Sequence, residues 1–421
     1  MKKIIALIFM FFYIYPILFI GLPFTTRIIL SLIGFMMFCY TLAYKKVFFF
    51  KRYFFMLIIL FSIFFLSCTT VLINGTTDLE FIKYPFSFCA ILFGAYGLFN
   101  IMRTVKINLD FCSVVELIIG VVFLQSVIAV IMYVIPEFYN FLLSLQNISP
   151  SEFEKMSSLS DMRVIGFGSQ YFGAGITNGF ALIMLAYLIR LGYYKNSLIK
   201  ASIVYVIIFS VGIAMARTTF IGLALSLLLL LPFESLRKIN VTLLRRNVRF
   251  YFAIFVFLIL SSGFVFAFFP SIISKIEPLV NFALEMFLNY INSGQFTTES
   301  TSQLETMYIF PQDINTYLIG DGLYTAADGL YYMGTDVGYL RLLFYFGVLG
   351  VFLFISLQLF LLRVSVPDIK DKSKFVCVIF LYIIVLNFKG FADLSSILAL
   401  FFIANIHHAR GGKKNIIPTM S

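Results

Sequence analysis

Long, almost uncharged apolar segments recur along nearly the whole chain and constrain its fold more than any other feature. A segment of roughly 18 or more apolar residues is long enough to cross a bilayer as a helix. Charged residues make up only 12% of the 421 residues, about half the fraction of a typical soluble domain. Backbone groups in lipid need partners within the protein, and the runs do not alternate as barrel strands do. The sequence therefore predicts an all-α polytopic membrane protein.

The apolar segments predict about 12 transmembrane helices, if short spans near the lower length limit are accepted. They lie near residues 4–21, 27–44, 53–73, 84–102, 113–135, 174–192, 201–216, 218–233, 250–269, 337–362, 375–388 and 391–406. Two of the underlying runs have charged residues at their middle, Arg217 in 200–233 and Lys389 in 375–406. Because a charge at mid-membrane is costly, each run is expected to be two short spans joined by a tight turn.

The distribution of basic residues predicts the orientation. Lys and Arg number 31 against 20 Asp and Glu, and with about 12 spans most of the basic residues fall on the side of the two termini. We therefore expect a multi-pass membrane protein with both termini in the cytoplasm. Residues 1–21 lack a small-residue cleavage site, which favours an uncleaved first span over a signal peptide. The positive charge is then a topology signal, so no nucleic-acid partner is expected.

We expect one integral membrane domain over residues 1–421, with two longer loops on the outer side of the membrane. The first covers residues 136–173, and the larger covers residues 270–336, before the tenth span. Long loops are uncommon unless they have a function. Apolar patches at 282–290 and 307–311 favour short helices lying on the membrane within the second loop.

Charged residues at span ends are the candidate functional groups, since an Arg within the bilayer costs roughly 2.5–3.5 kcal/mol. Arg217 has a planar fork of donors that matches phosphate oxygens, although it would also serve as an interface anchor. Asp336, near Arg341 at the start of the tenth span, is either a catalytic carboxylate or a helix cap. Lys389 and Asp393, four residues apart, form either a simple ion pair or the support of a site.

Three short segments occur in an order that is similar to a known family. They are Arg163-Val-Ile-Gly166-Phe167 before the small residues 173–175, Ala216-Arg217-Thr218 before 220–225, and Gly320-Asp-Gly322 before 336–340 and 347–350. With the long second loop, they resemble the Wzy-type O-antigen polymerases, relatives of the O-antigen ligases, over roughly residues 160–395. Ala216 stands where that family often has Ser. Ligases typically have a His near the position of Asp336, and the outer loops expected here contain none, which favours a polymerase.

The resemblance implies a metal-independent glycosyltransferase of lipopolysaccharide biosynthesis that needs no cofactor. It also implies a location in the bacterial inner membrane, with the two long outer loops in the periplasm. A growing glycan on undecaprenyl pyrophosphate would be transferred to the non-reducing-end hydroxyl of a new lipid-linked repeat unit at the periplasmic face. Membrane lipid and a chain-length regulator protein are the further partners that it implies.

The expected site has two kinds of residue, cationic ligands for the leaving pyrophosphate and a carboxylate base for the attacking hydroxyl. The substrate-binding candidates are Arg217 first, then Arg163 and Arg341, with Lys389. The catalytic candidates are Asp336 first, then Glu305 and Asp321.

Two other functions remain alternatives. A lipid-linked oligosaccharide flippase would have a similar length, but it should have short outer loops and charges lining a cavity across many spans. Here Glu116 is nearly alone within the expected spans. An O-antigen ligase should have a His in an outer loop, and the outer loops expected here contain none. The sequence leaves open the sugars, the linkage, the stereochemical outcome, the oligomeric state, and O-antigen versus capsule.

Overall fold

The computed structural model describes residues 2–44, 51–107, 109–169, 171–235, 238–239, 241–268 and 270–410. Within these residues the only strands form a short hairpin, β1 (Phe233–Ser235) and β2 (Lys238–Ile239). Seven of the described helices are long and apolar enough to cross a membrane, and shorter apolar helices accompany them. The protein is thus a helical membrane protein, which confirms the prediction from its apolar segments.

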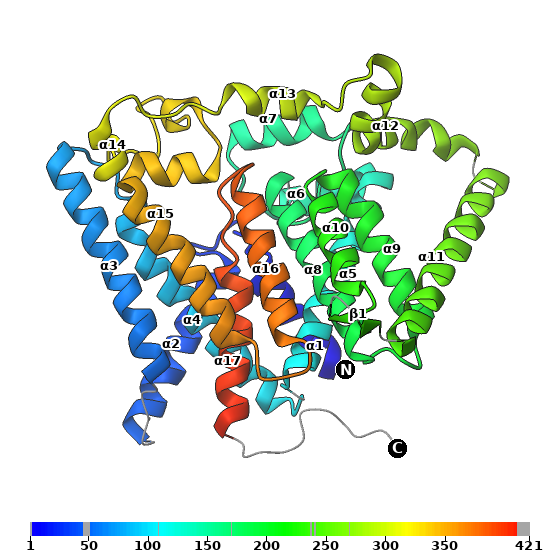
Figure 1. Ribbon diagram of the computed structural model, residues 1–421, viewed down its shortest axis with the longest axis horizontal. Coiled ribbons are helices and arrows are strands. Elements are labelled where there is room, and N and C mark those ends of the chain that lie inside the picture. The colour runs from blue at the N-terminus through cyan, green and yellow to red at the C-terminus, as the bar shows by residue number, and fades with distance from the viewer. Residues whose placement is uncertain are drawn as a thin grey trace. The chain divides into compact units, whose positions relative to one another are not determined.

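The helices belong to two compact units, and Figure 1 labels them along the chain. In chain order they are α1 (Lys2–Ile14), α2 (Thr26–Tyr44), α3 (Lys51–Asn74), α4 (Glu80–Thr104), α5 (Phe111–Val134), α6 (Pro136–Ser144), α7 (Pro150–Leu159), α8 (Tyr171–Leu191), α9 (Leu198–Met215), α10 (Thr219–Leu230), α11 (Val241–Phe268), α12 (Pro270–Ser293), α13 (Glu299–Thr306), α14 (Ile314–Leu318), η1 (Tyr332–Gly334), α15 (Gly338–Ser365), α16 (Lys372–Asn387) and α17 (Ser395–Arg410). Unit 1 comprises Met1–Ile14, Phe24–Val114 and Glu299–Ser421, and unit 2 comprises Tyr15–Pro23 and Val115–Thr298.

Unit 2 is built around α8, which is buried along almost its whole length. Both α9 and α10 pack against it. A Cβ added at Gly222 of α10 would lie 2.1 Å from the Cα of Gly179 of α8, so the two backbones are in direct contact. Small residues at such crossings are how helices associate closely in lipid. This packing holds α10 although it has only 12 residues.

Both apolar runs with central charges are divided into two helices, as predicted. In the first run α9 ends at Met215, Ala216 is extended, and α10 begins at Thr219. In the second run α16 ends at Asn387 and α17 begins at Ser395. The Asn387 side chain donates to the carbonyl of Ala392 and accepts from its amide. Side-chain hydrogen bonds of this kind replace helical ones that the break removes.

Two expected spans differ from the observed helices. The segment 4–21 is helical only as far as Ile14 in α1, because the residue before Pro16 disfavours the helical conformation. The expected span 337–362 lies within α15, which is broken at Gly347 with φ 69° and ψ −169°. That backbone conformation is accessible essentially only to glycine. The segment with Asp336 and Arg341 therefore precedes the break.

The turn 320–322 closes this break in unit 1. The amide of Asp321 donates to the carbonyl of Phe344 over 2.6 Å, and the amide of Gly322 donates to that of Tyr345 over 3.2 Å. Carbonyls at a helix end lack intrahelical partners, so the turn satisfies them. Gly320 and Gly322 both have positive φ, 80° and 68°.

Both long loops contain helices. The first includes α6 and α7, and the second includes α12, α13, α14 and η1. The apolar patch at 282–290 lies within α12, as predicted, but in a longer helix than expected. The prediction of a helix over 307–311 was wrong, because α13 ends at Thr306 and the chain is irregular there.

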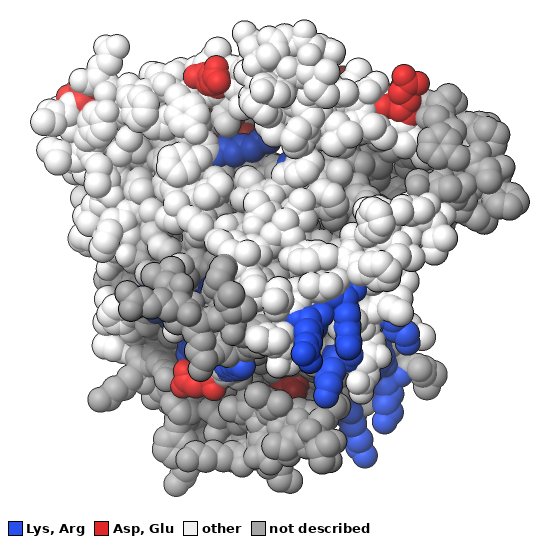
Figure 2. Space-filling model, turned by 45° about the vertical axis from the view of Figure 1, so that its right-hand side comes forward, with Lys and Arg blue, Asp and Glu red and all other residues white. Residues whose placement is uncertain are grey.

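Basic residues of unit 2 gather around the end of α8 and the starts of α9 and α11. They are Arg190, Lys195, Lys200, Arg245, Arg246 and Arg249. Figure 2 shows Lys and Arg side chains collected on one part of the surface, with uncharged surface above them. Positive charge collected at helix ends is typical of membrane proteins. Met1 and residues 411–421 lie outside the described residues, and the orientation of the termini stays a prediction.

Candidate functional site

Arg163 and Arg217 meet at the ring of Phe282 in unit 2. The guanidinium carbon of each lies 4.4 Å from the centroid of that ring. The three residues come from three segments: the loop after α7, the turn between α9 and α10, and α12. A guanidinium over an aromatic face gains roughly 0.5–2 kcal/mol. Two guanidiniums around one ring concentrate positive charge in a small volume.

Close packing against α8 positions Arg217. A Cβ added at Gly175 would lie 3.0 Å from the Cβ of Ala216 and 2.9 Å from that of Thr218. Glycine at 175 therefore allows the turn with Arg217 to lie directly on the start of α8. Ala216 packs against this glycine, so a larger side chain at position 216 would not fit there.

Arg163 is positioned by the docking of its loop onto the end of α9. The amide of Val164 donates to the carbonyl of Ala214 over 3.1 Å. A Cβ added at Gly166 would lie 2.8 Å from the backbone oxygen of Ser169, so a larger residue would displace the loop. The first two segments of the resemblance are therefore adjacent in space, which the sequence alone did not predict.

Glu285 forms an ion pair with Arg217. Their side chains are 25% and 12% exposed. Glu285 lies three residues after Phe282, so both are on one face of α12. Leu279, one turn earlier, packs in a cluster with Val164 and Met215 and anchors this helix. Sequence reasoning missed Phe282 and Glu285. The sequence signal that could have identified them was Glu285 itself, a single carboxylate within an otherwise apolar stretch of the second loop.

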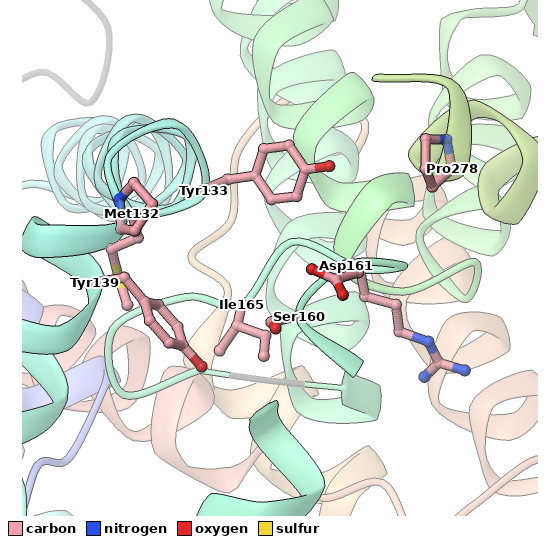
Figure 3. A pocket seen from close by; sticks show the side chains of 9 residues that line it. Met132, Tyr133, Tyr139, Ser160, Asp161, Ile165 and Pro278 are labelled. Atoms are coloured by element: carbon pink, nitrogen blue, oxygen red, sulfur yellow. The ribbon is translucent and has the colours of Figure 1, made fainter. Parts of the chain in front are cut away.

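A pocket of about 440 Å³ lies beside Arg163, which is one of its lining residues. Its other polar lining residues are Tyr133, Tyr139, Ser160 and Asp161. Figure 3 shows these side chains arranged around one hollow. The hydroxyl of Tyr139 is buried and has no hydrogen-bond partner among the described atoms. Burial raises the pKa of Tyr139, so it remains a neutral hydroxyl group at physiological pH.

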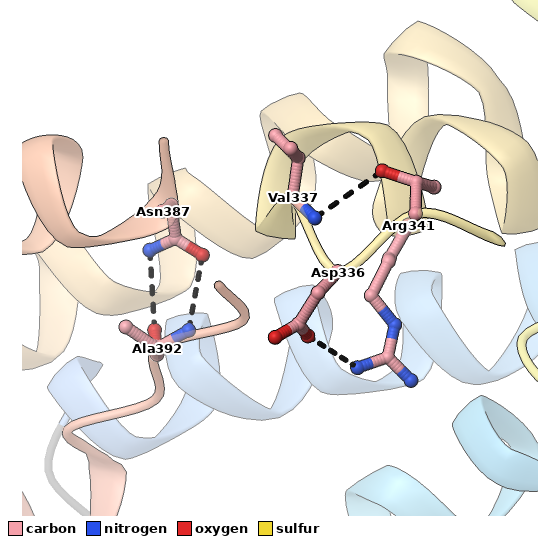
Figure 4. Close-up of polar contacts among 6 residues, drawn as sticks. Asp336, Val337, Arg341, Asn387 and Ala392 are labelled. Atoms are coloured by element: carbon pink, nitrogen blue, oxygen red, sulfur yellow. Dashed lines mark hydrogen bonds and ion pairs between the residues drawn. The ribbon is translucent and has the colours of Figure 1, made fainter. Parts of the chain in front are cut away.

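Asp336 and Arg341 form a second cluster, in unit 1. Nη1 of Arg341 donates to Oδ1 of Asp336 over 3.4 Å (Figure 4). The guanidinium carbon lies 3.7 Å from the ring centroid of Tyr324 and 4.1 Å from that of Tyr331. Arg341 is only 8% exposed, and its Nε has no hydrogen-bond partner within the described structure. This arginine is therefore held in one orientation by two rings and a carboxylate.

Asp321 lies in the turn that closes the break in α15. Its carboxylate accepts hydrogen bonds from the hydroxyls of Thr316, over 2.6 Å, and Tyr332, over 3.2 Å. Burial raises the pKa of Tyr332, and the nearby Asp321 charge raises it further. Tyr332 therefore stays a donor, and the two hydroxyls hold the Asp321 carboxylate in place within this loop. Glu305 is exposed on α13.

Lys389 is half-buried in the turn between α16 and α17. Asp393 in the same turn accepts hydrogen bonds from the hydroxyl of Tyr84, over 3.0 Å, and the amide of Gln358, over 2.6 Å. These contacts attach the turn to α4 and α15.

The candidate residues thus fall into two groups, one in each compact unit. Arg163 and Arg217 are together in unit 2, and Asp336 and Arg341 are together in unit 1. Across the described residues, no group of three or more His, Cys, Asp or Glu side chains is placed to hold a metal ion.

Comparison of the chain with protein-family models, with curated proteins and with solved structures finds no match. Functional inference therefore depends on the two clusters themselves.

Proposed function

We propose that the protein is a polysaccharide polymerase of the Wzy type in the bacterial inner membrane. It would transfer a growing glycan from undecaprenyl pyrophosphate onto a new lipid-linked repeat unit at the periplasmic face. The observation that supports this most directly is the convergence of Arg163 and Arg217 on Phe282.

The chemistry of the leaving group explains why two arginines are useful. In the proposed reaction a sugar hydroxyl oxygen bonds to the anomeric carbon of the donor, and the bond from that carbon to the pyrophosphate oxygen breaks. Negative charge then grows on the lipid pyrophosphate, whose oxygens lie on two phosphorus atoms. Guanidiniums that share one ring can donate to both phosphates and stabilise this charge. Glu285 would be displaced from Arg217 by the phosphate.

The proton of the attacking hydroxyl passes to a carboxylate in this scheme. Asp336 is the first candidate, followed by Glu305 and Asp321. Arg341, with its side chain held between Tyr324 and Tyr331, is the cationic candidate of the same unit, and Lys389 is the fourth substrate-binding candidate. A chain-length regulator protein is a proposed partner.

The proposal includes a topology of twelve spans. In this proposal the seven long apolar helices supply seven spans, and α1, α10, α11, α16 and α17 would supply the other five. With both termini in the cytoplasm, the turns that contain Arg217 and Lys389 lie at the periplasmic face. The loop helices α6, α7, α12, α13 and α14 lie on that side as well.

The test is replacement of Arg217 with Ala and with Lys in the native host. The length of the surface polysaccharide is read on a gel, and membrane insertion is checked by immunoblot. We expect Arg217→Ala to remove the ladder and to leave single repeat units on the lipid core. Lys should restore little, because it cannot bind two phosphate oxygens in a planar fork. Arg249→Ala, at an exposed arginine of α11, is the matched control and should leave the ladder intact.

Two outcomes would contradict the proposal. Loss of even the single repeat unit would favour the flippase or ligase alternatives, because a polymerase is not needed for that product. An unchanged ladder would mean that Arg217 is an interface anchor and that the pyrophosphate site is elsewhere.

A further inference from the structure

We infer that the pocket beside Arg163 is a sugar subsite, which binds the monosaccharide attached directly to the pyrophosphate. The ligand class is a sugar with a phosphate on its anomeric oxygen. This inference rests on the proposed function, because it takes the neighbouring arginines as the pyrophosphate site.

The lining of the pocket matches the two-sided chemistry of a sugar ring. Met132, Ile165 and Pro278 provide apolar surface, which suits the C–H face of a pyranose. Tyr133 and Tyr139 add aromatic surface with a hydroxyl at one end. A volume of about 440 Å³ lies within the usual range of small-molecule sites. An apolar enclosure with a few polar groups is the usual composition of such sites.

Asp161 is the group that would select for hydroxyls. Asp161 is exposed at the pocket, and because a carboxylate only accepts hydrogen bonds, a sugar hydroxyl or an acetamido N–H would replace a water donor there. The buried hydroxyl of Tyr139 has no partner among the described atoms. Leaving a buried polar group unpaired is unfavourable, and a sugar hydroxyl would pair with it. Ser160 lies beside Asp161 and lines the same pocket.

Arg163 connects the subsite to the arginine pair. Its side chain lines the pocket, and its guanidinium carbon lies 4.4 Å from the Phe282 centroid that it shares with Arg217. A phosphate bound by Arg163 would thus be adjacent to the pocket. The first sugar of a lipid-linked glycan is bonded to such a phosphate, so it would be placed in the pocket without any rearrangement of the loop.

The experiment measures binding of two lipids to the purified full-length protein in detergent. One is undecaprenyl pyrophosphate, and the other is the undecaprenyl-pyrophosphate-linked repeat unit extracted from a host strain that lacks the gene. The wild-type protein should bind the glycosylated lipid about tenfold more tightly. Asp161→Asn and Tyr139→Phe should lose most of this preference and keep the affinity for the bare lipid. Glu154→Gln, which alters an exposed carboxylate of α7 outside the pocket, is the matched control and should keep both affinities.

The possible results separate the subsite from the proposed function. Equal binding of the two lipids by the wild type, or a preference that both pocket variants retain, overturns the sugar subsite and leaves the pyrophosphate site in place. If Arg217→Ala binds the bare lipid as the wild type does, the pyrophosphate site itself is wrong. Tyr139→Phe removes a single oxygen atom, so an unchanged melting temperature with a lost preference attributes the effect to the ligand rather than to folding.

Discussion

At the scale of single residues, the ion pair of Arg217 and Glu285 determines the state of the candidate site without substrate. A guanidinium that is 12% exposed needs a counter-charge, and Glu285 supplies it from α12. The same carboxylate occupies donors that a phosphate would use. Glu285 therefore neutralises Arg217 in the unliganded site, and binding of an anion exchanges this negative partner for another.

The exchange of Glu285 for a phosphate as the partner of Arg217 predicts the behaviour of Glu285→Gln. We expect the variant to unfold more easily by about 1–3 kcal/mol, because Arg217 loses a charged partner in a poorly solvated position. Inorganic pyrophosphate should restore stability, since a ligand at a hundred times its Kd adds about 2.7 kcal/mol. Thermal unfolding of the purified protein with and without pyrophosphate measures both effects. Glu154→Gln serves as control, and a Glu285 variant that melts like the wild type would show that the ion pair contributes nothing.

At the scale of elements, interrupted helices leave backbone N–H and C=O groups without the helical hydrogen bonds that an unbroken helix would give them. The turns at Arg217 and Lys389 and the break at Gly347 are three such interruptions. Each is closed by other groups of the protein, such as the amides of Asp321 and Gly322 at the break in α15. Irregular backbone at membrane depth is tolerated only where it is buried in protein or lines a water-filled cavity.

Gly347→Ala tests the break in α15. With φ 69° and ψ −169°, alanine is strained, and its Cβ would lie 2.6 Å from the carbonyl oxygen of Tyr317. We expect a loss of about 1–3 kcal/mol of stability, measured as a lower melting temperature in detergent. The control is Gly173→Ala in α8, where a Cβ meets nothing within 4 Å and alanine favours the helix. Equal melting of the two variants would contradict the account of the break.

At the scale of the whole molecule, the charge distribution follows from the cost of moving basic residues across a membrane. Basic side chains lie at the ends of the apolar helices, as the basic residues around α8, α9 and α11 do. This asymmetry predicts which helix ends face the cytoplasm.

Labelling of single cysteines tests the orientation. The five native cysteines are free, so their replacement breaks no disulfide. A cysteine at Glu154 or Glu305, in the two long loops, should react with a membrane-impermeant maleimide in spheroplasts. A cysteine at Lys195 should react only after the membrane is permeabilised. The reverse pattern would invert the topology and exclude a periplasmic site.

The sequence by itself determined the class of the protein, the interruptions at Arg217 and Lys389, and the candidate arginines. These are local properties, because the cost of a charge in lipid depends on the residue and its immediate neighbours. The break at Gly347 was not predicted, since glycine is frequent in membrane helices and its φ is not visible in a sequence.

Only the tertiary structure decided which candidates share a site. Phe282, Glu285 and Asp161 are unremarkable in their own segments, and they matter because three distant segments pack together around Arg163 and Arg217. Such contacts depend on the close approach of helices at Gly175 and Gly222. That approach depends on both of the surfaces that pack together. The sequence therefore predicted the chemistry of the arginines, and the fold determined their partners, because long-range packing is not encoded by any one segment.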